Sequence, residues 1–200
     1  MSTTRMTIGI GRASGASAPG DTVVCKLPFM DEASKLALFE QTIVPHLNAA
    51  HNLAGWLTRN QRDAEDVVQE AYLRAFRFFD GFHGGDGRAW LLAVVRNTCL
   101  SWMARRAGAE SASVEFDEHV HRTADEEESV EELLIKNSKI NSLRICVEAL
   151  PVEYREVIVL RELQELSYRE ISEIAGIPIG TVMSRLSRGR MRLLDCMEAK

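Results

Sequence analysis

The sequence lacks any long hydrophobic run, and this bounds where the protein can act. No stretch of its 200 residues approaches the roughly 20 consecutive apolar residues that a membrane-spanning helix requires. Residues 1–30 are rich in Ser, Thr, Gly and Ala and contain no apolar segment of the kind that a secretory signal carries. We therefore expect a flexible N-terminal tail, a cytoplasmic protein and no direct membrane insertion.

Closely spaced cysteines are also missing. None of the four cysteines forms a C-x-x-C pair, so the spacing predicts neither a zinc site nor a dense disulfide framework. Reduced thiols are the expected state. The cysteines are Cys25, Cys99, Cys146 and Cys196. Nothing in the pattern resembles a nucleophile–base pair, a metal cluster or a phosphate-binding loop, and we expect no catalytic residues, no metal, no cofactor and no enzyme activity.

Proline and, after residue 30, glycine are sparse, whereas helix-forming Leu, Ala, Glu and Arg recur. This composition predicts an all-α protein. The formal net charge of −5 argues against a generally basic nucleic-acid binder. It does not exclude nucleic-acid binding, because the charge of the binding face determines the local field.

The first half of the chain, residues 31–108, has the apolar periodicity of several helices. A first stripe combines Leu36, Phe39, Ile43 and Leu47. A second helix is expected from Asp63, a candidate N-cap, with one apolar face. That face consists of Val68, Ala71, Tyr72, Ala75 and Phe79. We predict a helical domain over residues 31–108.

A glycine-rich segment interrupts this domain. Residues 80–88, "DGFHGGDGR", contain four glycines and predict a loop. The helix that follows ends at Arg105 and Arg106, before Gly108, where basic residues favour a helix C-terminus. Its expected core face consists of Leu91, Val94, Val95, Thr98 and Trp102.

An acidic segment separates the two halves. The stretch from Glu110 to Glu132 contains ten acidic residues and one arginine. We predict a solvated linker over residues 109–132 and a second small helical domain over residues 133–200.

The second domain contains a helix-turn-helix pattern. Ser167 and Glu170 have the S-x-x-E spacing of a capping box that opens a short helix. Gly176 is expected to end that helix, and Pro178 to begin the next one. Two helices joined by a tight glycine turn are typical of DNA-binding proteins.

The second helix of this motif carries four arginines and no acid between Thr181 and Arg192. One face is apolar, through Val182, Leu186, Gly189 and Leu193. The opposite face carries basic and hydroxyl side chains that suit a DNA major groove. These are Thr181, Ser184, Arg185, Arg188 and Arg192. The alternative is an ordinary amphipathic helix with a solvated charged face.

Two longer segments resemble a known family. "DAEDVVQEAYLRAF" with "FHGGDGRAWLLAVVRNTCLSWMARR" resembles the promoter-melting and core-binding domain of bacterial RNA polymerase sigma factors. "LPVEYREVIVLRELQELSYREISEIAGIPIGTVMSRLSRGRMRLL" resembles their C-terminal promoter-binding domain. This two-domain layout is similar to the extracytoplasmic-function (ECF) group of the sigma-70 family.

The resemblance implies roles for particular residues. The expected contacts with core RNA polymerase are Asp63, Glu65, Asp66 and Gln69. The expected −35 contacts are the face of Thr181, Ser184, Arg185, Arg188 and Arg192. The expected contacts with a melted −10 strand are Phe82, Asp86, Arg88, Arg96, Asn97, Ser101, Arg105 and Arg106. Trp90 is expected in the core and not as a stacking platform.

The same resemblance implies three partners: core RNA polymerase, promoter DNA and an anti-sigma factor. Two other hypotheses stay open at this point. One is a stand-alone helix-turn-helix regulator that binds duplex DNA without polymerase. The other is a helical enzyme or adaptor in which the arginine face has no role in binding.

Overall fold

The computed structural model describes residues 31–82, 84–109 and 130–199, without the side chains of residues 108, 109 and 130–138. The predicted tail (1–30) and nearly all of the predicted linker lie outside these residues. Within the described ranges every regular element is a helix, as the composition predicts. The elements are α1 (Glu32–Thr42), η1 (Val44–His46), α2 (Leu47–Thr58), α3 (Gln61–Phe78), η2 (Phe79–Gly81), α4 (Gly87–Ala109), α5 (Val130–Ala149), α6 (Val152–Ile158), η4 (Val159–Leu163), α7 (Tyr168–Ala175) and α8 (Ile179–Glu198).

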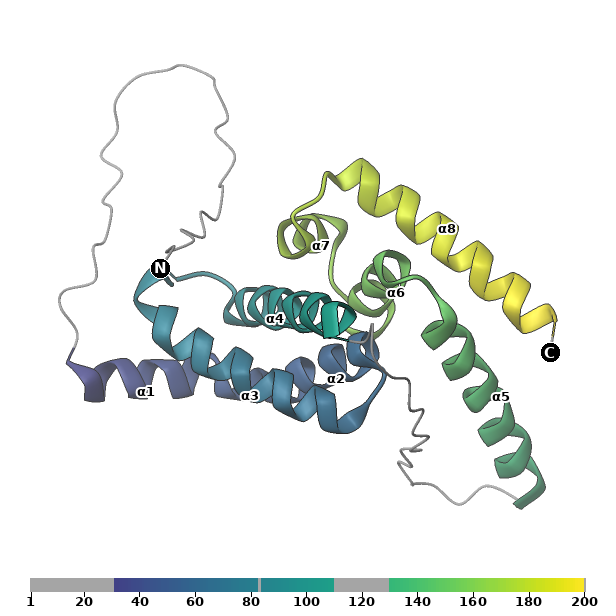
Figure 1. The fold of residues 1–200 in the computed structure, drawn as a ribbon, viewed down its shortest axis with the longest axis horizontal. Helices are drawn as coiled ribbons and strands as arrows, with labels where there is room; N and C mark the ends of the chain where they lie inside the picture. Colours follow the sequence, from purple (N-terminus) through teal and green to yellow (C-terminus); the bar gives the residue numbers. More distant parts are fainter. Residues whose placement is uncertain (1–30, 83, 110–129, 200) are drawn as a thin grey trace.

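Helices α1 to α4 form a first bundle in which α2, α3 and α4 pack against one another (Figure 1). The predicted N-cap of α3 is wrong by one turn. Asn60 caps this helix, and its side chain accepts a hydrogen bond of 3.1 Å from the backbone N–H of Asp63. Asp63 instead lies in the first turn of α3, where its charge favours the helix dipole.

The apolar face predicted for α3 is largely confirmed, since Val68, Ala71, Ala75 and Phe79 are buried. The stripe predicted at the start of the chain is only half right. Phe39 and Ile43 are buried, but Leu36 is 46% and Leu47 is 37% exposed. The reason is the 3₁₀ turn η1, which separates α1 from α2 and breaks the period that the stripe assumes.

Aromatic rings fill the end of the first bundle where the glycine-rich loop leaves it. Phe39 meets the rings of Phe76 and Phe79 edge to face, at centroid distances of 5.3 and 5.2 Å. Phe82 stacks on Phe79 at 5.5 Å and lies 5.4 Å from Trp90. Trp90 thus packs against the core, as the sequence predicts.

The second bundle, α5 to α8, contains the predicted helix-turn-helix. Ser167 and Glu170 form the capping box at the start of α7, and both of its reciprocal hydrogen bonds are present. Gly176 ends α7 in the left-handed region, at φ 65°. The segment before α7 is not one regular α-helix, because α6 passes into a π-helical turn, η4.

The two bundles share one continuous core, with α4 beside α7 and α2 beside α6 (Figure 1). Arg155 of α6 is 3% exposed and bridges them. Its guanidinium donates to the carbonyl oxygens of Glu148 (2.7 Å) and Leu150 (3.3 Å) and across the boundary to that of Leu57 (3.3 Å). Burial lowers the pKa of Arg155 to about 10, with the charge of Arg59 acting in the same direction.

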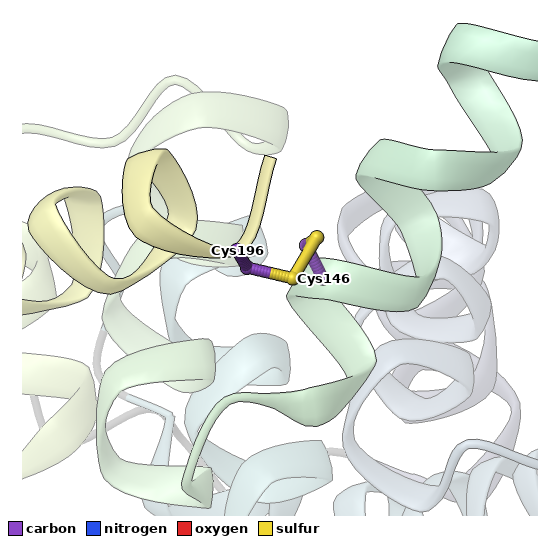
Figure 2. The surroundings of a disulfide bond; sticks show 2 residues. All are labelled: Cys146 and Cys196. Carbon is purple, nitrogen blue, oxygen red and sulfur yellow. A yellow bond between two sulfur atoms is a disulfide. The ribbon is translucent and has the colours of Figure 1, made fainter. Parts of the chain in front are cut away.

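The expectation of reduced thiols is wrong for two cysteines. Cys146 of α5 and Cys196 of α8 form a disulfide (Figure 2). The sequence could not show this pairing, because packing of α5 against α8 brings together residues 50 positions apart. Cys99 is a buried free thiol, and burial raises its pKa to about 12.

Candidate functional site

The arginine face of the helix-turn-helix lies on the outer side of α8. Ser184, Arg188 and Arg192 are exposed, and Thr181 and Arg185 are half-buried. Arg185 and Arg188 form no ion pair within the described part of the chain. Their guanidinium groups are therefore available to an anionic ligand.

The opposite face of α8 packs against α6 and α7 as predicted. Val182 and Leu186 are buried in the common core. Gly189 allows the closest approach, since a Cβ atom added there would lie 3.1 Å from Ile158 Cγ1 and 3.4 Å from Tyr154 Cβ. Close packing thus explains why position 189 holds a glycine, although glycine intrinsically weakens a helix.

Two of the four arginines on α8 have partners in their own chain. Arg190 lies off the predicted DNA face and donates to Glu162 Oε1 at 2.6 Å, and this hydrogen bond raises the pKa of Arg190. Arg192 stacks over the ring of Tyr154, 5.1 Å from its centroid. Arg185 and Arg188 are the two that remain open.

The polar face of α3 presents the four side chains expected to contact polymerase. Glu65, Asp66 and Gln69 are exposed, and Asp63 is half-buried. Asp63 pairs with Arg106 at 2.8 Å, and Glu65 accepts a hydrogen bond of 3.0 Å from Gln61. Asp66 and Gln69 form no hydrogen bond to another side chain in the described residues, so they are the most accessible of the set.

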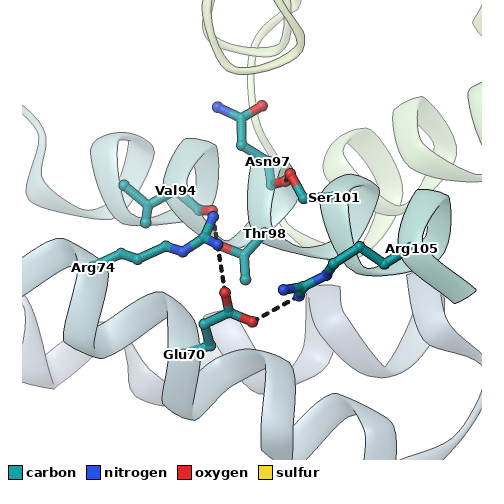
Figure 3. Close-up of polar contacts among 7 residues, drawn as sticks. All are labelled: Glu70, Arg74, Val94, Asn97, Thr98, Ser101 and Arg105. Carbon is teal, nitrogen blue, oxygen red and sulfur yellow. Dashed lines mark hydrogen bonds and ion pairs between the residues drawn. The ribbon is translucent and has the colours of Figure 1, made fainter. Parts of the chain in front are cut away.

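A further acidic residue of α3, Glu70, links this helix to α4, and the sequence analysis does not identify it. Glu70 pairs with Arg74 and, at 3.0 Å, with Arg105 (Figure 3). Burial opposes ionisation of Glu70, but the hydrogen bond from Arg105 and the charge of Arg74 outweigh it and lower the pKa of the carboxyl group. The signal that could have found Glu70 is its i, i+4 spacing to Arg74.

The glycine-rich loop leads directly into α4. Gly84 and Gly85 have φ values of 85° and 103°, which favour glycine. Asp86 is exposed, and its Oδ1 accepts the backbone N–H of Arg88 at 2.8 Å. Phe82, by contrast, is only 8% exposed and stacks in the aromatic cluster. The structure therefore presents Asp86 at the surface and keeps Phe82 in the core.

Asn97 and Ser101 lie one turn apart on α4, as predicted. Figure 3 shows the Asn97 amide on the side of α4 away from Glu70. The Oδ1 atom of Asn97 accepts a hydrogen bond of 3.1 Å from Arg96, and the Ser101 hydroxyl donates to the Asn97 carbonyl at 2.8 Å. Both side chains are partly exposed.

Two arginines predicted to contact DNA are instead engaged by the second bundle. Arg88 donates to the Gln164 side chain at 2.8 Å and to the Gln164 carbonyl at 2.9 Å. Arg96 forms an ion pair with Glu156, in which the Arg96 side chain is 16% and the Glu156 side chain 3% exposed. We call these two contacts the interdomain latch.

The carboxylate and amide of the latch were missed in the sequence. Glu156 and Gln164 stand in "VEYREVIVLRELQEL" among five other charged residues, so residue type alone does not single them out. Burial of such groups requires a partner. Arg88, the partner of Gln164, lies 76 positions away in the sequence, so only the fold reveals the contact.

Comparison with known proteins finds both halves in one family. Residues 42–108 match the family described as sigma-70 region 2, and residues 140–193 match sigma-70 region 4. The chain is 33% identical over 148 residues to the ECF RNA polymerase sigma-E factor of Escherichia coli K12, covering 70% of this chain and 78% of that protein. This chain belongs to the ECF group of the sigma-70 family.

Other relatives agree with this assignment. ECF RNA polymerase sigma factor SigE of Mycolicibacterium smegmatis is 31% identical over 157 residues, which cover 78% of this chain and 60% of that protein. Among solved structures, the sigma factor RpoE of Bartonella quintana, crystallised with the anti-sigma factor NepR, is 28% identical. It superimposes with a TM-score of 0.66 over 80% of this chain and 96% of that one.

Family membership determines the general activity. As a sigma factor, the chain directs transcription with core RNA polymerase, and sigma factors are transcription initiation factors rather than enzymes. The hypothesis of a stand-alone regulator is not favoured. Within the described residues of this sigma factor, no helix is long and apolar enough to cross a membrane.

Proposed function

We propose that this sigma factor reads promoters through two separate surfaces and binds polymerase through a third. The exposed arginine and hydroxyl face of α8 would bind the −35 element as duplex, through Thr181, Ser184, Arg185, Arg188 and Arg192. The observation that carries this proposal is the unpaired Arg185 and Arg188 on the second helix of a region 4 helix-turn-helix. We also propose that the two domains span residues 31–108 and 133–200, and that residues 109–132 form an acidic linker between them.

The melted −10 strand would bind along the loop before α4 and along α4 itself. Asn97 can both donate to and accept from a base edge, and Asp86 lies exposed beside two glycines that let a base approach. Arg88, Arg96, Arg105 and Arg106 would provide phosphate contacts. Each of these arginines is engaged within the chain in the described form, so DNA has to compete with Gln164, Glu156, Glu70 and Asp63 respectively.

Simultaneous binding of both elements requires the two bundles to separate. The −35 and −10 positions differ by about 25 base pairs, or about 85 Å at about 3.4 Å per base pair. In the described form the two bundles are in direct hydrogen-bonded contact through Arg88 and Gln164. The described form is therefore a closed state, and we infer that the interdomain latch opens when the protein joins polymerase at a promoter.

The polar face of α3 would dock on core RNA polymerase. Asp63, Glu65, Asp66 and Gln69 combine acidic and amide groups opposite a buried apolar face, which suits a positively charged partner surface. Asp66 and Gln69 are the strongest candidates, because both are exposed and neither has a side-chain partner among the described residues.

An anti-sigma factor is the proposed regulatory partner, and the cytoplasm the proposed location. The solved relative from Bartonella quintana is bound to its anti-sigma factor NepR. The similarity of its fold to the described form supports a comparable partner for this chain. Polymerase as a partner supports a cytoplasmic location.

The experiment is reconstitution with core RNA polymerase on a promoter selected from genomic fragments. We expect promoter-dependent transcripts and a stable complex with core enzyme, both lost in Asp66→Arg. Glu40→Arg is the matched control, since Glu40 is an exposed acid of the same bundle on α1, outside the polar face of α3. Failure of the wild-type protein to bind core, or equal binding by Asp66→Arg, would refute the proposal.

A further inference from the structure

Neither cysteine of the disulfide between α5 and α8 is among the proposed DNA contacts, and the surroundings of the bond indicate a further role. Cys146 is 1% exposed, whereas Cys196 is partly exposed. Their Cα atoms lie 5.8 Å apart, a separation that a disulfide bridges without backbone movement. The disulfide borders an open pocket whose other walls include Leu150, Pro151, Arg192 and Asp195. The pocket therefore borders the disulfide on the side of the less buried cysteine, Cys196.

The disulfide is the covalent attachment of the C-terminal turns of α8 to α5. The fully buried residues of α8 are Val182, Leu186 and Gly189, all in its first eleven residues. Beyond Gly189 the side chains are exposed or half-buried, including Met191 at 61% and Leu194 at 58%. Leu193 packs against the common core and Arg192 stacks on Tyr154, but the disulfide joins this end of the helix to α5, so breaking the covalent bond would loosen the end from α5.

The partner α5 has few buried side chains. Those among the described residues are Cys146 and Val147, while Ile140, Leu143 and Ile145 are about half exposed. Neither Cys146 nor Val147 belongs to the common core, which Leu150 joins directly after the helix. The Cys146–Cys196 bond therefore determines whether α5 and the end of α8 move together.

We propose that Cys146 and Cys196 form a reversible redox modification site that clamps or releases the C-terminal turns of α8. The argument for reversibility rests on the proposed function, because a protein that works with RNA polymerase is exposed to a reducing compartment. Disulfides there are usually transient and redox-sensing. A permanent structural role would instead place the bond in an oxidising compartment, away from polymerase.

The chemistry needs a peroxide as oxidant and a dithiol protein or glutathione as reductant. The Cys196 thiolate attacks one peroxide oxygen, which forms a sulfenic acid and releases water or an alcohol. The Cys146 thiol then attacks that sulfur, which forms the disulfide and releases water. In the reverse direction a reductant thiolate attacks the Cys196 sulfur and releases the Cys146 thiol, and a second reductant thiol frees Cys196 and leaves as a disulfide.

Cys99 provides an internal comparison. It is fully buried in the first bundle, and burial raises the pKa of its thiol to about 12. Such a thiol is inert toward oxidants and alkylating reagents. Reactivity is thus confined, among the described cysteines, to the pair that joins α5 and α8.

The predicted consequence is local. Thr181, Ser184, Arg185 and Arg188 lie on the half of α8 that Val182 and Leu186 anchor, so this half stays in place in both redox states. Arg192 lies one turn before Cys196 and lines the same pocket. Its stacking on Tyr154 is expected to loosen when the bond is reduced.

The first test is a glutathione titration of the purified full-length protein, with free thiols trapped by an alkylating reagent and located by mass spectrometry. We expect both forms to be populated in buffers that span the poise of a bacterial cytosol, with Cys146 and Cys196 changing together and Cys99 staying unmodified. A bond that resists reduction throughout that range, or that never forms in oxidised buffer, overturns the proposal. This titration needs no polymerase, so its failure leaves the proposed sigma activity untouched.

The second test compares amide hydrogen exchange in the oxidised and reduced wild-type protein. We expect reduction to remove protection from residues 190–198 and 140–149 and to leave residues 181–189 unchanged. Cys196→Ser should resemble the reduced form in both redox buffers, and Cys99→Ser should respond like wild type. If Cys196→Ser does not fold, the wild-type comparison alone still decides. Equal exchange in the two wild-type forms refutes the clamp.

Discussion

The two helices that we propose to contact DNA differ in how far their arginines are already engaged. On α8, Arg185 and Arg188 are open and form no ion pair within the described residues. On α4, Arg88 and Arg96 are held by Gln164 and Glu156 of the other bundle. The proposed −35 surface thus keeps two arginines open within the described residues, whereas two arginines of the proposed −10 surface are engaged by the other bundle.

The difference between the two sets of arginines matches the order in which the two forms of promoter DNA become available. Duplex DNA is present before polymerase acts, whereas a melted strand exists only after the promoter opens. Until the promoter opens, Arg88 and Arg96 can therefore bind Gln164 and Glu156 instead of a single strand. Under the proposed function, the closed form can bind duplex DNA but has to release Arg88 and Arg96 before these arginines contact a −10 strand.

The largest effect is expected from breaking the latch at its buried end. Glu156→Ala leaves Arg96 without its partner in a mostly buried position, which should cost the closed form about 3 kcal/mol. The radius of gyration from X-ray scattering should rise, and the thermal midpoint should fall. Glu153→Ala, on the same helix but outside any described ion pair, is the control. Equal radii for the two variants would show that the latch does not hold the bundles together.

A slightly smaller effect is expected where α8 approaches α6. Gly189→Leu would force a side chain against Ile158 and Tyr154, and such overpacking costs about 2 kcal/mol. Chemical denaturation should reveal this loss. Gly180→Leu offers the comparison on the same helix, because a Cβ atom there meets nothing within 4 Å. If both variants are equally stable, close packing does not explain Gly189.

The readiness of the α8 surface can be tested on duplex DNA alone. Arg188→Ala should weaken binding to a −35 duplex by about tenfold and reduce the slope of the salt dependence by about 1. Arg190→Ala removes the same charge from the face paired with Glu162 and should retain most of the affinity. Equal losses would mean that net charge, and not the proposed face, determines binding.

The smallest effect concerns pH. Because the pKa of Glu70 is lower in the folded protein than its ordinary value of 4.5, its stabilising contribution is present above that value. The contribution is lost as the pH falls through the folded pKa. Glu70→Gln should therefore flatten the acid limb of stability against pH and change little at neutral pH. If stability falls equally at low pH in Glu70→Gln and in the wild type, the ion pairs of Glu70 do not stabilise the packing of α3 against α4.

Local features of this fold could be read from the sequence, but long-range pairings could not. The capping box at Ser167, the αL end at Gly176 and the buried face of α8 follow from residue type and spacing, and all three are confirmed. They depend on neighbours within one or two turns. The family-specific segments also identified both halves correctly.

The errors arise where tertiary packing decides the outcome. The Cys146–Cys196 bond and the Arg96–Glu156 pair join residues 50 and 60 positions apart, and no spacing rule predicts either. Leu36 and Leu47 fit an apolar period but stay partly exposed, because η1 shifts the phase between α1 and α2. Arg88 and Arg96, which the sequence predicts as DNA contacts, thus also have partners within the chain.

The most direct test of the closed-to-open transition is the distance between the two bundles, measured by pulsed spin-label spectroscopy. Labels introduced as non-natural amino acids at the exposed positions Leu73 on α3 and Glu173 on α7 leave the cysteines intact. We predict one short distance in the free protein and a distance longer by tens of ångströms in the complex with core polymerase and promoter, as the roughly 85 Å between the elements requires. An unchanged distance in a transcriptionally active complex would contradict the account.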